Sequence, residues 1–233
     1  MRLNALANAI REELLPLDGV KKLILNRRAA AVFSVGTPAN HVFFLDAGLV
    51  KIERVTEGNK EILLSVVAPG EIFGEQALTG EGAFNASAKV LESGIAYSIP
   101  SDTFQRFCDR RPEVWRLLMQ HLLLRKDELE RKIEHLCHSD VKERLVYYLE
   151  ELARLNPGHD PSGSVIHISQ NELASLVGAT RETTSTTLNA LARQGLIALG
   201  HRLVMIPALE MLRDSVNGAS HLRTTSAGAA QQV

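Results

Sequence analysis

One segment near the carboxyl end of the chain, residues 169–197, constrains the fold more than any other. Its sequence is SQNELASLVGATRETTSTTLNALARQGLI, which predicts two short helices joined by a tight turn. Ser169 and Glu172 have the spacing of a capping box, which opens the first helix. Gly178 favours the positive φ at which many helices end, and Thr180 can cap the second helix.

The two predicted helices separate buried from exposed residues. Ala174, four residues before Gly178, is small enough for the second helix to cross the first closely. The inner face is predicted to contain Leu173, Leu176, Val177, Thr184, Leu188 and Leu191. This spacing is typical of a helix-turn-helix, which inserts the start of its second helix into the DNA major groove. A helical hairpin within some other all-α core is the alternative.

The outward face of the second helix is polar enough to contact DNA. Its members can reach guanine, cytosine or phosphate, and they are Arg181, Glu182, Ser185, Thr186 and Asn189. The whole chain holds 26 Lys and Arg against 27 Asp and Glu, a formal net charge of −1. Nucleic-acid binders usually carry a basic patch, so here that patch must be local. Arg193, Arg202 and Lys142 are further candidates for it.

Length and composition exclude several classes of protein. The 233 residues allow one large or two small domains. No apolar run is long enough to span a bilayer, and the first residues lack the features of a secretory signal. Cys108 and Cys137 are too few for a disulfide framework or a cysteine metal cluster. We therefore expect a cytoplasmic protein without a membrane partner, and we find no motif of an enzyme.

The pattern along the chain predicts an α+β fold. Residues 2–28 are expected to be helical, and residues 31–100 show short apolar alternations between glycine turns, as in a β-barrel or jelly roll. A short helix is expected over 104–107, and a long one from Pro112 to His138. A strand over 165–168 and a hairpin over 197–206 would make the helix-turn-helix a winged one.

These elements predict four domains. They are a barrel domain with an N-terminal helix (1–111), the long helix and hinge (112–139), a winged helix-turn-helix (140–217) and a disordered tail (218–233). The break between the long helix and the next one gives the candidate hinge, His138, Ser139 and Asp140.

The long helix has an apolar seam suited to a partner. Leu122, Leu129 and Leu136 follow Trp115 at seven-residue intervals. Leu118 is expected on the same seam, with Ile133 beside it, whereas Arg125 and Lys132 interrupt it. We favour a homodimer seam, because helix-turn-helix proteins usually bind DNA as two-fold pairs. A helix packed on its own barrel is the alternative.

The order of barrel, long helix, hinge and winged helix resembles the bacterial Crp–Fnr transcription regulators, from about residue 14 to Pro207. The resemblance rests on VGATRETTSTTLNALARQGLI, on PGEIFGEQALTGEGAFNASAKV and on the hinge aspartate, Asp140. The second motif looks like the phosphate-binding cassette of a cyclic-nucleotide barrel. The chain is not a close match to either the cyclic-AMP receptor or the iron–sulfur oxygen sensor of that family.

The resemblance implies a homodimer that binds palindromic double-stranded DNA and contacts RNA polymerase. It implies that Arg181 reads guanine and Glu182 the cytosine side of a neighbouring pair, next to the Thr180 cap. It places Ser169, Gln170 and Thr183 at phosphates. Thr186 stands where the family often has a second arginine, so the half-site should differ there, because threonine cannot make the paired bonds of arginine to guanine.

The cassette departs from the cyclic-AMP pattern of the family. Phe73, Gly74 and Glu75 fit it, and Gln76 and Ala77 follow. Asn85 and Ala86 replace the arginine and hydroxyl residue that hold the cyclic phosphate, and Leu129 and Glu130 replace the residues that contact adenine. Asparagine offers only a neutral donor where arginine gives charge-assisted bonds. We therefore predict a sensor barrel that does not use cyclic AMP.

Other effectors and functions stay open. Two cysteines cannot hold an iron–sulfur cluster. Haem needs one or two axial ligands, for which the conceivable residues are His41, His121, His135, His138 and Cys137. We predict no metal or cofactor, with haem or a small-molecule effector left open, together with any redox role of the cysteines. The alternative function is an effector-binding module whose winged helix docks a protein rather than DNA.

Overall fold

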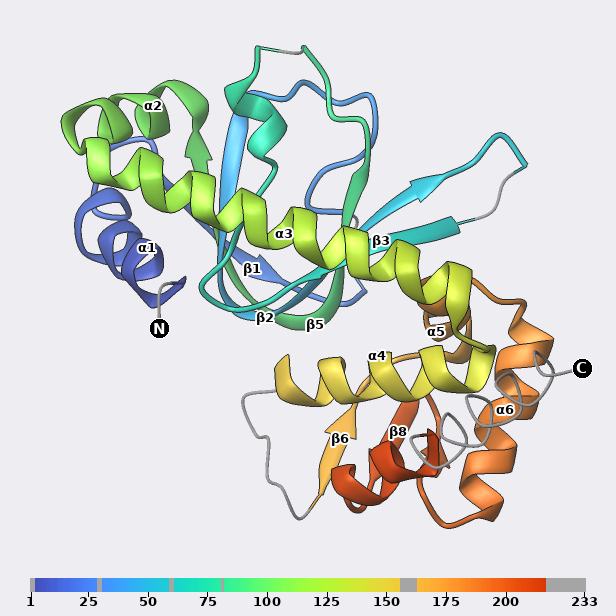
Figure 1. Cartoon of the computed structure of the whole chain (residues 1–233). Coiled ribbons are helices and arrows are strands. Elements are labelled where there is room, and N and C mark those ends of the chain that lie inside the picture. Colours follow the sequence, from blue (N-terminus) through green and yellow to red (C-terminus); the bar gives the residue numbers. More distant parts are fainter. Residues whose placement is uncertain (1–2, 29–30, 59–60, 81, 156–162, 217–233) are drawn as a thin grey trace, which may run out of the picture. The chain divides into compact units, whose positions relative to one another are not determined.

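The computed structural model describes residues 3–28, 31–58, 61–80, 82–155 and 163–216 (Figure 1). The chain divides into two compact units, Met1–Arg131 and Lys132–Val233. One long helix runs through the division, and each unit is otherwise built around its own core. The α+β class expected from the sequence is confirmed.

The chain begins with a helix and then turns into an edge strand. α1 (Leu3–Ala9) continues as the π-helical η1 (Ile10–Leu14), whose Ile10 and Leu14 are fully buried. The expectation of helix up to residue 28 is wrong, because β1 (Lys21–Leu25) pairs with a later strand over its whole length. A glycine at positive φ, Gly19, makes the turn between the two.

An antiparallel sheet forms the centre of the first unit. Its strands are β2 (His41–Val55), β3 (Glu61–Val67), β4 (Ile72–Phe73) and β5 (Ser87–Pro100), with β1 at one edge. The order is β1-β5-β2-β3, and β4 pairs with β2. Strands are confirmed within the expected region from His41 onward, but β2 and β5 are long, at 15 and 14 residues, where short strands were expected. Residues 31–40 contribute isolated bridges, such as Phe33 with Ala88.

Two glycines let the longest pair of strands bend. β2 and β5 pair through several register shifts around Ala47. A Cβ on Gly94 would lie 1.9 Å from the Ala47 carbonyl oxygen, and one on Gly48 would lie 2.6 Å from the Glu92 carbonyl oxygen. The backbones therefore approach more closely there than any side chain allows.

Helices cover the sheet next to the N-terminal turns. η2 (Glu75–Leu78) is a single 3₁₀ turn, α2 is Ser101–Arg110, and α3 is Pro112–His138. The long helix has the bounds expected from the sequence, whereas the short helix is longer than residues 104–107. Figure 1 shows α1 and α2 beside the first turns of α3. Their shared core includes Leu14, Phe104, Cys108, Val114 and Leu118.

The second unit is a winged helix-turn-helix. It contains α4 (Val141–Leu155), β6 (Ser164–Ile166), α5 (Gln170–Val177), α6 (Arg181–Arg193), β7 (Ala198–Gly200) and β8 (Leu203–Ile206). The strands order as β6-β8-β7, and residues 209–216 are helical. The expected strand and hairpin are confirmed within two residues at their ends. The predicted tail (218–233) lies outside the described residues.

Candidate DNA interface and effector pocket

The first helix of the helix-turn-helix begins and ends as its sequence predicts. The Ser169 Oγ accepts a hydrogen bond from the Glu172 amide at 3.3 Å, and the Glu172 carboxylate accepts one from the Ser169 amide at 2.8 Å. This is a complete capping box. At the other end Gly178 has φ 66°, so the predicted left-handed residue is confirmed.

A side chain at Gly178 would also meet Leu136. A Cβ there would lie 2.6 Å from the Leu136 Cδ2 atom at the end of α3, which is the end of an exposed, flexible side chain that can shift. The left-handed backbone is therefore what requires glycine at this position. Leu136 consequently packs against the turn that precedes α6.

The second helix presents its predicted polar face. Thr180 caps α6 by accepting a hydrogen bond from the Thr183 amide at 3.1 Å. Thr184, Leu188 and Leu191 are buried, which confirms the predicted inner face. The candidate DNA contacts lie on the accessible side: Thr180, Arg181, Glu182, Thr183, Thr186 and Asn189 are exposed, and Ser169, Gln170 and Ser185 are half-buried. Arg181 and Glu182 stand in the first turn, which is the part that enters a groove in proteins of this architecture.

Basic residues flank this surface unequally. Arg202, at the tip of the wing, has φ 55° and its Nη2 lies 3.4 Å from the Glu172 Oε2. It therefore lies beside the start of α5, near Ser169. Lys142 does not add to the surface, because its Nζ donates to the Ser215 carbonyl at 2.7 Å. Arg193 is exposed in the last turn of α6.

The candidate hinge is held by an arginine that the sequence did not single out. α3 ends at His138 and α4 begins at Val141. Asp140 and Glu143 form reciprocal hydrogen bonds at 2.8 and 2.9 Å across the start of α4. Arg144 is buried and donates to the carbonyls of Ser139, at 2.6 Å, and Val177, at 2.7 Å. The hinge and the end of α5 are thus joined through one guanidinium.

Two stripes run along α3, where the sequence indicated one. Val114, Leu118 and His121 are buried against the first unit. The predicted seam position of Leu118 is therefore wrong, since its side chain is 3% exposed and belongs to the core. The second stripe consists of exposed apolar residues that follow one another at alternating spacings of four and three residues. Its members are Trp115, Met119, Leu122, Leu129, Ile133 and Leu136. Lys126 occupies the one gap in this series, which we call the outer stripe.

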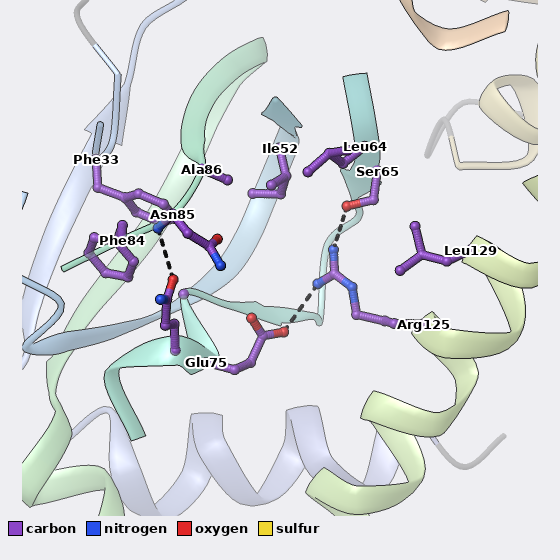
Figure 2. A pocket seen from close by; sticks show the side chains of 12 residues that line it. Phe33, Ile52, Leu64, Ser65, Glu75, Phe84, Asn85, Ala86, Arg125 and Leu129 are labelled. Carbon is purple, nitrogen blue, oxygen red and sulfur yellow. Dashed lines mark hydrogen bonds and ion pairs between the residues drawn. The ribbon is translucent and has the colours of Figure 1, made fainter. Parts of the chain in front are cut away.

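A cavity of about 270 Å³ opens between the sheet and α3 (Figure 2). It is lined by Phe33, Ile52, Leu64, Ser65, Gly74, Glu75, Gln76, Phe84, Asn85, Ala86, Arg125 and Leu129. Six residues of the predicted pocket are among them: Gly74, Glu75, Gln76, Asn85, Ala86 and Leu129. The other three, Phe73, Ala77 and Glu130, do not line it. Phe73 and Ala77 are buried behind the wall, and Glu130 is exposed and paired with Lys126.

Arg125 is the main pocket residue that the sequence interpretation missed. Its Nη1 lies 3.1 Å from the Ile72 carbonyl and 3.3 Å from the Glu75 Oε1, and its Nη2 lies 2.9 Å from the Ser65 Oγ. Figure 2 shows this guanidinium reaching from α3 to the opposite wall. The signal was present, because a charged residue at an expected apolar position called for a partner of its own.

Glu75 is the acidic centre of the pocket. Its Oε1 faces Arg125 and also lies 3.7 Å from the Nε2 of the buried His121. Burial alone would raise the pKa of Glu75, but the nearby His121 and the charge of Arg125 outweigh that effect. The pKa of this carboxyl therefore lies below its ordinary value, and Glu75 is ionised at neutral pH.

The cassette loop is held by a glutamine within it and by an arginine of β2. The Gln76 Oε1 accepts a hydrogen bond from the Asn85 amide at 3.0 Å, and the Asn85 carbonyl accepts one from the Arg54 Nε at 3.1 Å. The Ala86 side chain is buried in the wall. Gly74, at φ 76°, begins the 3₁₀ turn, and a Cβ there would lie 3.0 Å from the Phe43 ring. The loop thus keeps its conformation without a charged side chain at position 85.

The candidate haem ligands and cysteines are scattered. His41 bonds to Asn40, and the His135 ring lies tilted against Tyr147, 4.1 Å between centroids, with its Nδ1 3.1 Å from the Ser139 Oγ. Cys137 and His138 are exposed at the end of α3. Burial raises the pKa of the Cys108 thiol to about 12, which keeps it in its unreactive form. In the described residues no three His, Cys, Asp or Glu are placed to hold a metal, and no helix could cross a membrane.

Comparison with known proteins identifies the two units. Residues 27–111 match the cyclic nucleotide-binding domain, and residues 143–215 match the Crp-like helix-turn-helix domain. The CRP-like cAMP-activated global transcriptional regulator of Mycobacterium tuberculosis is 31% identical over 79% of this chain and 84% of its own. The global nitrogen regulator of Synechococcus elongatus is 31% identical over 77% and 82%.

Solved structures agree with these relatives. A Crp/Fnr-family transcriptional regulator of Thermus thermophilus is 27% identical, with a TM-score of 0.70 over 84% of this chain and 96% of that one. The c-di-GMP-responsive global regulator of Xanthomonas campestris shares the fold at 24% identity, with a TM-score of 0.72 over 86% and 98%. The chain is thus a transcription regulator with a helix-turn-helix DNA-binding domain. It belongs to the Crp/Fnr family.

Proposed function

We propose that the protein is a homodimer that binds a palindromic DNA site through the first turn of α6. One observation carries this proposal: Arg181 and Glu182 are exposed directly after the Thr180 cap, on a helix whose opposite face is buried. Arginine there can form paired bonds to guanine, and glutamate can accept from the cytosine amino group. A helix that docked a protein would present apolar residues at these positions instead.

The other polar residues take supporting roles in this proposal. Ser169, Gln170, Thr180 and Thr183 contact phosphates, which fix the register of the protein on the duplex. Ser185, Thr186 and Asn189 continue the face of α6. Because Thr186 gives at most one weak bond or a methyl contact, the half-site differs there from a site read by a second arginine.

The outer stripe of α3 forms the dimer contact. Its apolar residues recur in the four-and-three spacing of a coiled-coil seam, and they are exposed in the single chain. A two-fold dimer would bury them and would present two copies of α6 to the two halves of a palindrome. His138, Ser139 and Asp140 then serve as the hinge between seam and DNA-binding domain.

The sensor barrel does not use cyclic AMP in this proposal. The phosphate of a cyclic nucleotide needs a cationic partner, and position 85 offers a neutral amide. Position 86 offers a buried methyl group where a hydroxyl would serve. The relatives themselves differ, since one is named for activation by cAMP and another for its response to c-di-GMP. The identity of the effector therefore does not follow from membership of the family.

The remaining proposals follow from the DNA-binding role. The protein works in the bacterial cytoplasm, has no catalytic activity of its own, and contacts RNA polymerase when bound near a promoter. The relatives are transcription regulators, which supports all three of these proposals.

Selection of binding sites from a random DNA library tests the proposed function. We expect an enriched inverted repeat whose half-sites are centred about 10 base pairs apart, with two chains bound per site. The Thr186→Arg variant should shift the preferred base at one position in each half-site and leave the symmetry unchanged. Enrichment of an asymmetric sequence, or of none, would contradict the proposal.

A further inference from the structure

The charges of the side chains that line the pocket determine which ligands it can bind. The inference drawn from them rests on the proposed sensor role of the barrel. Among the described residues that line the pocket, Glu75 and Arg125 alone are charged. They pair with each other at 3.3 Å, so the lining has no net charge. The Asn85 side chain, at the mouth, is a neutral amide, and the nearby Arg54, which does not line the pocket, donates to the Asn85 carbonyl.

An anionic ligand finds no uncompensated positive charge in this lining. Both terminal nitrogens of Arg125 already donate, to Glu75, to the Ile72 carbonyl and to Ser65. An anion that recruited Arg125 would have to displace the Glu75 carboxylate, and it would then lie beside a second negative charge. Moving a charge out of water without a new partner costs several kcal/mol.

A cationic ligand is disfavoured for the corresponding reason. The negative charge of Glu75 is compensated by Arg125, whose side chain is 15% exposed. An added cation would meet the guanidinium within the same small cavity. An uncharged molecule avoids both penalties.

The carboxylate nevertheless sets one requirement. An ionised carboxylate accepts hydrogen bonds and donates none, and it has several lone pairs beyond the one directed at Arg125. Figure 2 shows Glu75 directed into the space between Asn85 and Arg125. A ligand there must therefore offer an O–H or N–H group to Glu75.

The rest of the lining is apolar. Four aliphatic residues line the pocket from different parts of the fold: Ile52 from β2, Leu64 from β3, Ala86 from the cassette loop and Leu129 from α3. Their surfaces can cover a planar or aliphatic group of small size, given a volume of about 270 Å³.

We propose that the pocket binds an uncharged small molecule that donates a hydrogen bond to Glu75 and packs an apolar group against Leu64 and Leu129. This class differs from an anionic cyclic nucleotide in charge, and it uses the aliphatic residues of β3 and α3. Binding of such a molecule joins the two walls of the pocket that Arg125 already connects.

Matched pairs of probes that differ mainly in charge test the proposal. We would titrate the full-length protein, without DNA, by calorimetry with adenosine and cyclic AMP, tryptophol and indole-3-acetate, and 2-phenylethanol and phenylacetate. In every pair for which binding is detected, the neutral compound should bind about tenfold more tightly than the anion. The reason is that the anion loses one charged contact or gains one repulsion. Since no DNA is present, failure of DNA recognition does not affect this readout.

Two substitutions sharpen the test. Asn85→Arg, at an exposed position, should raise the affinity of the anionic members about tenfold and leave that of the neutral members nearly unchanged. Gln194→Arg adds the same charge on the other unit, and it should change neither.

Three results would overturn the proposal. The first is that the anions bind the wild-type protein as tightly as their neutral partners. The second is that none of the neutral probes binds with a Kd below about 1 mM. The third is that the Asn85→Arg variant ranks the affinities of the probes in the same order as the wild type. Preference for the neutral members, reversed or removed by Asn85→Arg alone, supports it.

Discussion

Single charged side chains determine what each half of this molecule can recognise. In the pocket, Arg125 and Glu75 neutralise each other across 3.3 Å. In the DNA-binding unit, Arg181 and Glu182 are exposed at consecutive positions, and neither forms such a pair within the part of the chain that the structure describes. We propose that the same two residue types close one site against charged ligands and open the other towards bases and phosphates.

The lowered pKa of Glu75 makes an acid-dependent stability prediction. A carboxyl whose folded pKa is depressed stabilises the fold fully above its unfolded pKa, and this contribution is lost as pH falls through the folded value. Glu75→Gln should lower the free energy of unfolding at pH 7 by about 2 kcal/mol, because Arg125 loses its partner. It should also flatten the decline of stability below about pH 4.5.

Both effects are measured by urea unfolding between about pH 3 and 7. This range is chosen because ordinary carboxyl pKa values lie at about 4. Glu130→Gln is the control, because its pair with Lys126 is exposed, screened by water and of little weight in stability. Parallel stability curves for the wild type and Glu75→Gln would show that the Glu75 ion pair has no such role.

At the scale of elements, α3 carries a buried stripe and an exposed apolar stripe on different faces. The inward stripe of Val114, Leu118 and His121 belongs to the first unit, and the outer stripe begins one residue later with Trp115 and Met119. Heptad spacing in the sequence detected an apolar seam, but it could not resolve two stripes offset by one residue. Leu118 was therefore placed on the wrong face, and Arg125 was read as an interruption although it serves the pocket.

The outer stripe makes a prediction about oligomeric state. Leu122→Asp places a charge within the seam and should convert a dimer into a monomer, because burying an unpaired carboxylate costs several kcal/mol. Leu124→Asp is the matched control: the same residue type is similarly exposed, 43% against 37%, but lies nearly opposite on the helix. Sedimentation equilibrium distinguishes them. A wild-type monomer, or a Leu122→Asp dimer, would rule out this seam.

Across the whole molecule, the sequence predicted elements with local signals better than it predicted the surroundings of a site. The capping box, Gly178 and the bounds of α3 depend on neighbours in sequence, and all were predictable. β1 was missed because Lys21–Leu25 becomes a strand only by pairing with β5, more than 60 residues away. Phe33, Leu64 and Arg125 reach the pocket for the same reason, through folding of distant segments onto one another.

The division of the molecule into two units gives each substitution a separate readout. We propose that ligand binding depends on the first unit and base recognition on the second. Changes in the pocket, such as Asn85→Arg, are therefore expected to alter ligand affinity without changing the preferred DNA bases. Changes on α6 should do the opposite.

The claim that α6 reads DNA is tested most directly by titrating wild-type and Arg181→Ala protein on the selected palindrome and on scrambled DNA at one fixed salt concentration. We predict that Arg181→Ala loses about 1–3 kcal/mol per half-site on the palindrome, so that its preference over scrambled DNA largely disappears. Arg193→Ala, at the far end of the same helix, should weaken both affinities alike and keep the preference. An Arg181→Ala protein that retains the wild-type preference would contradict the assignment of α6 as the recognition helix.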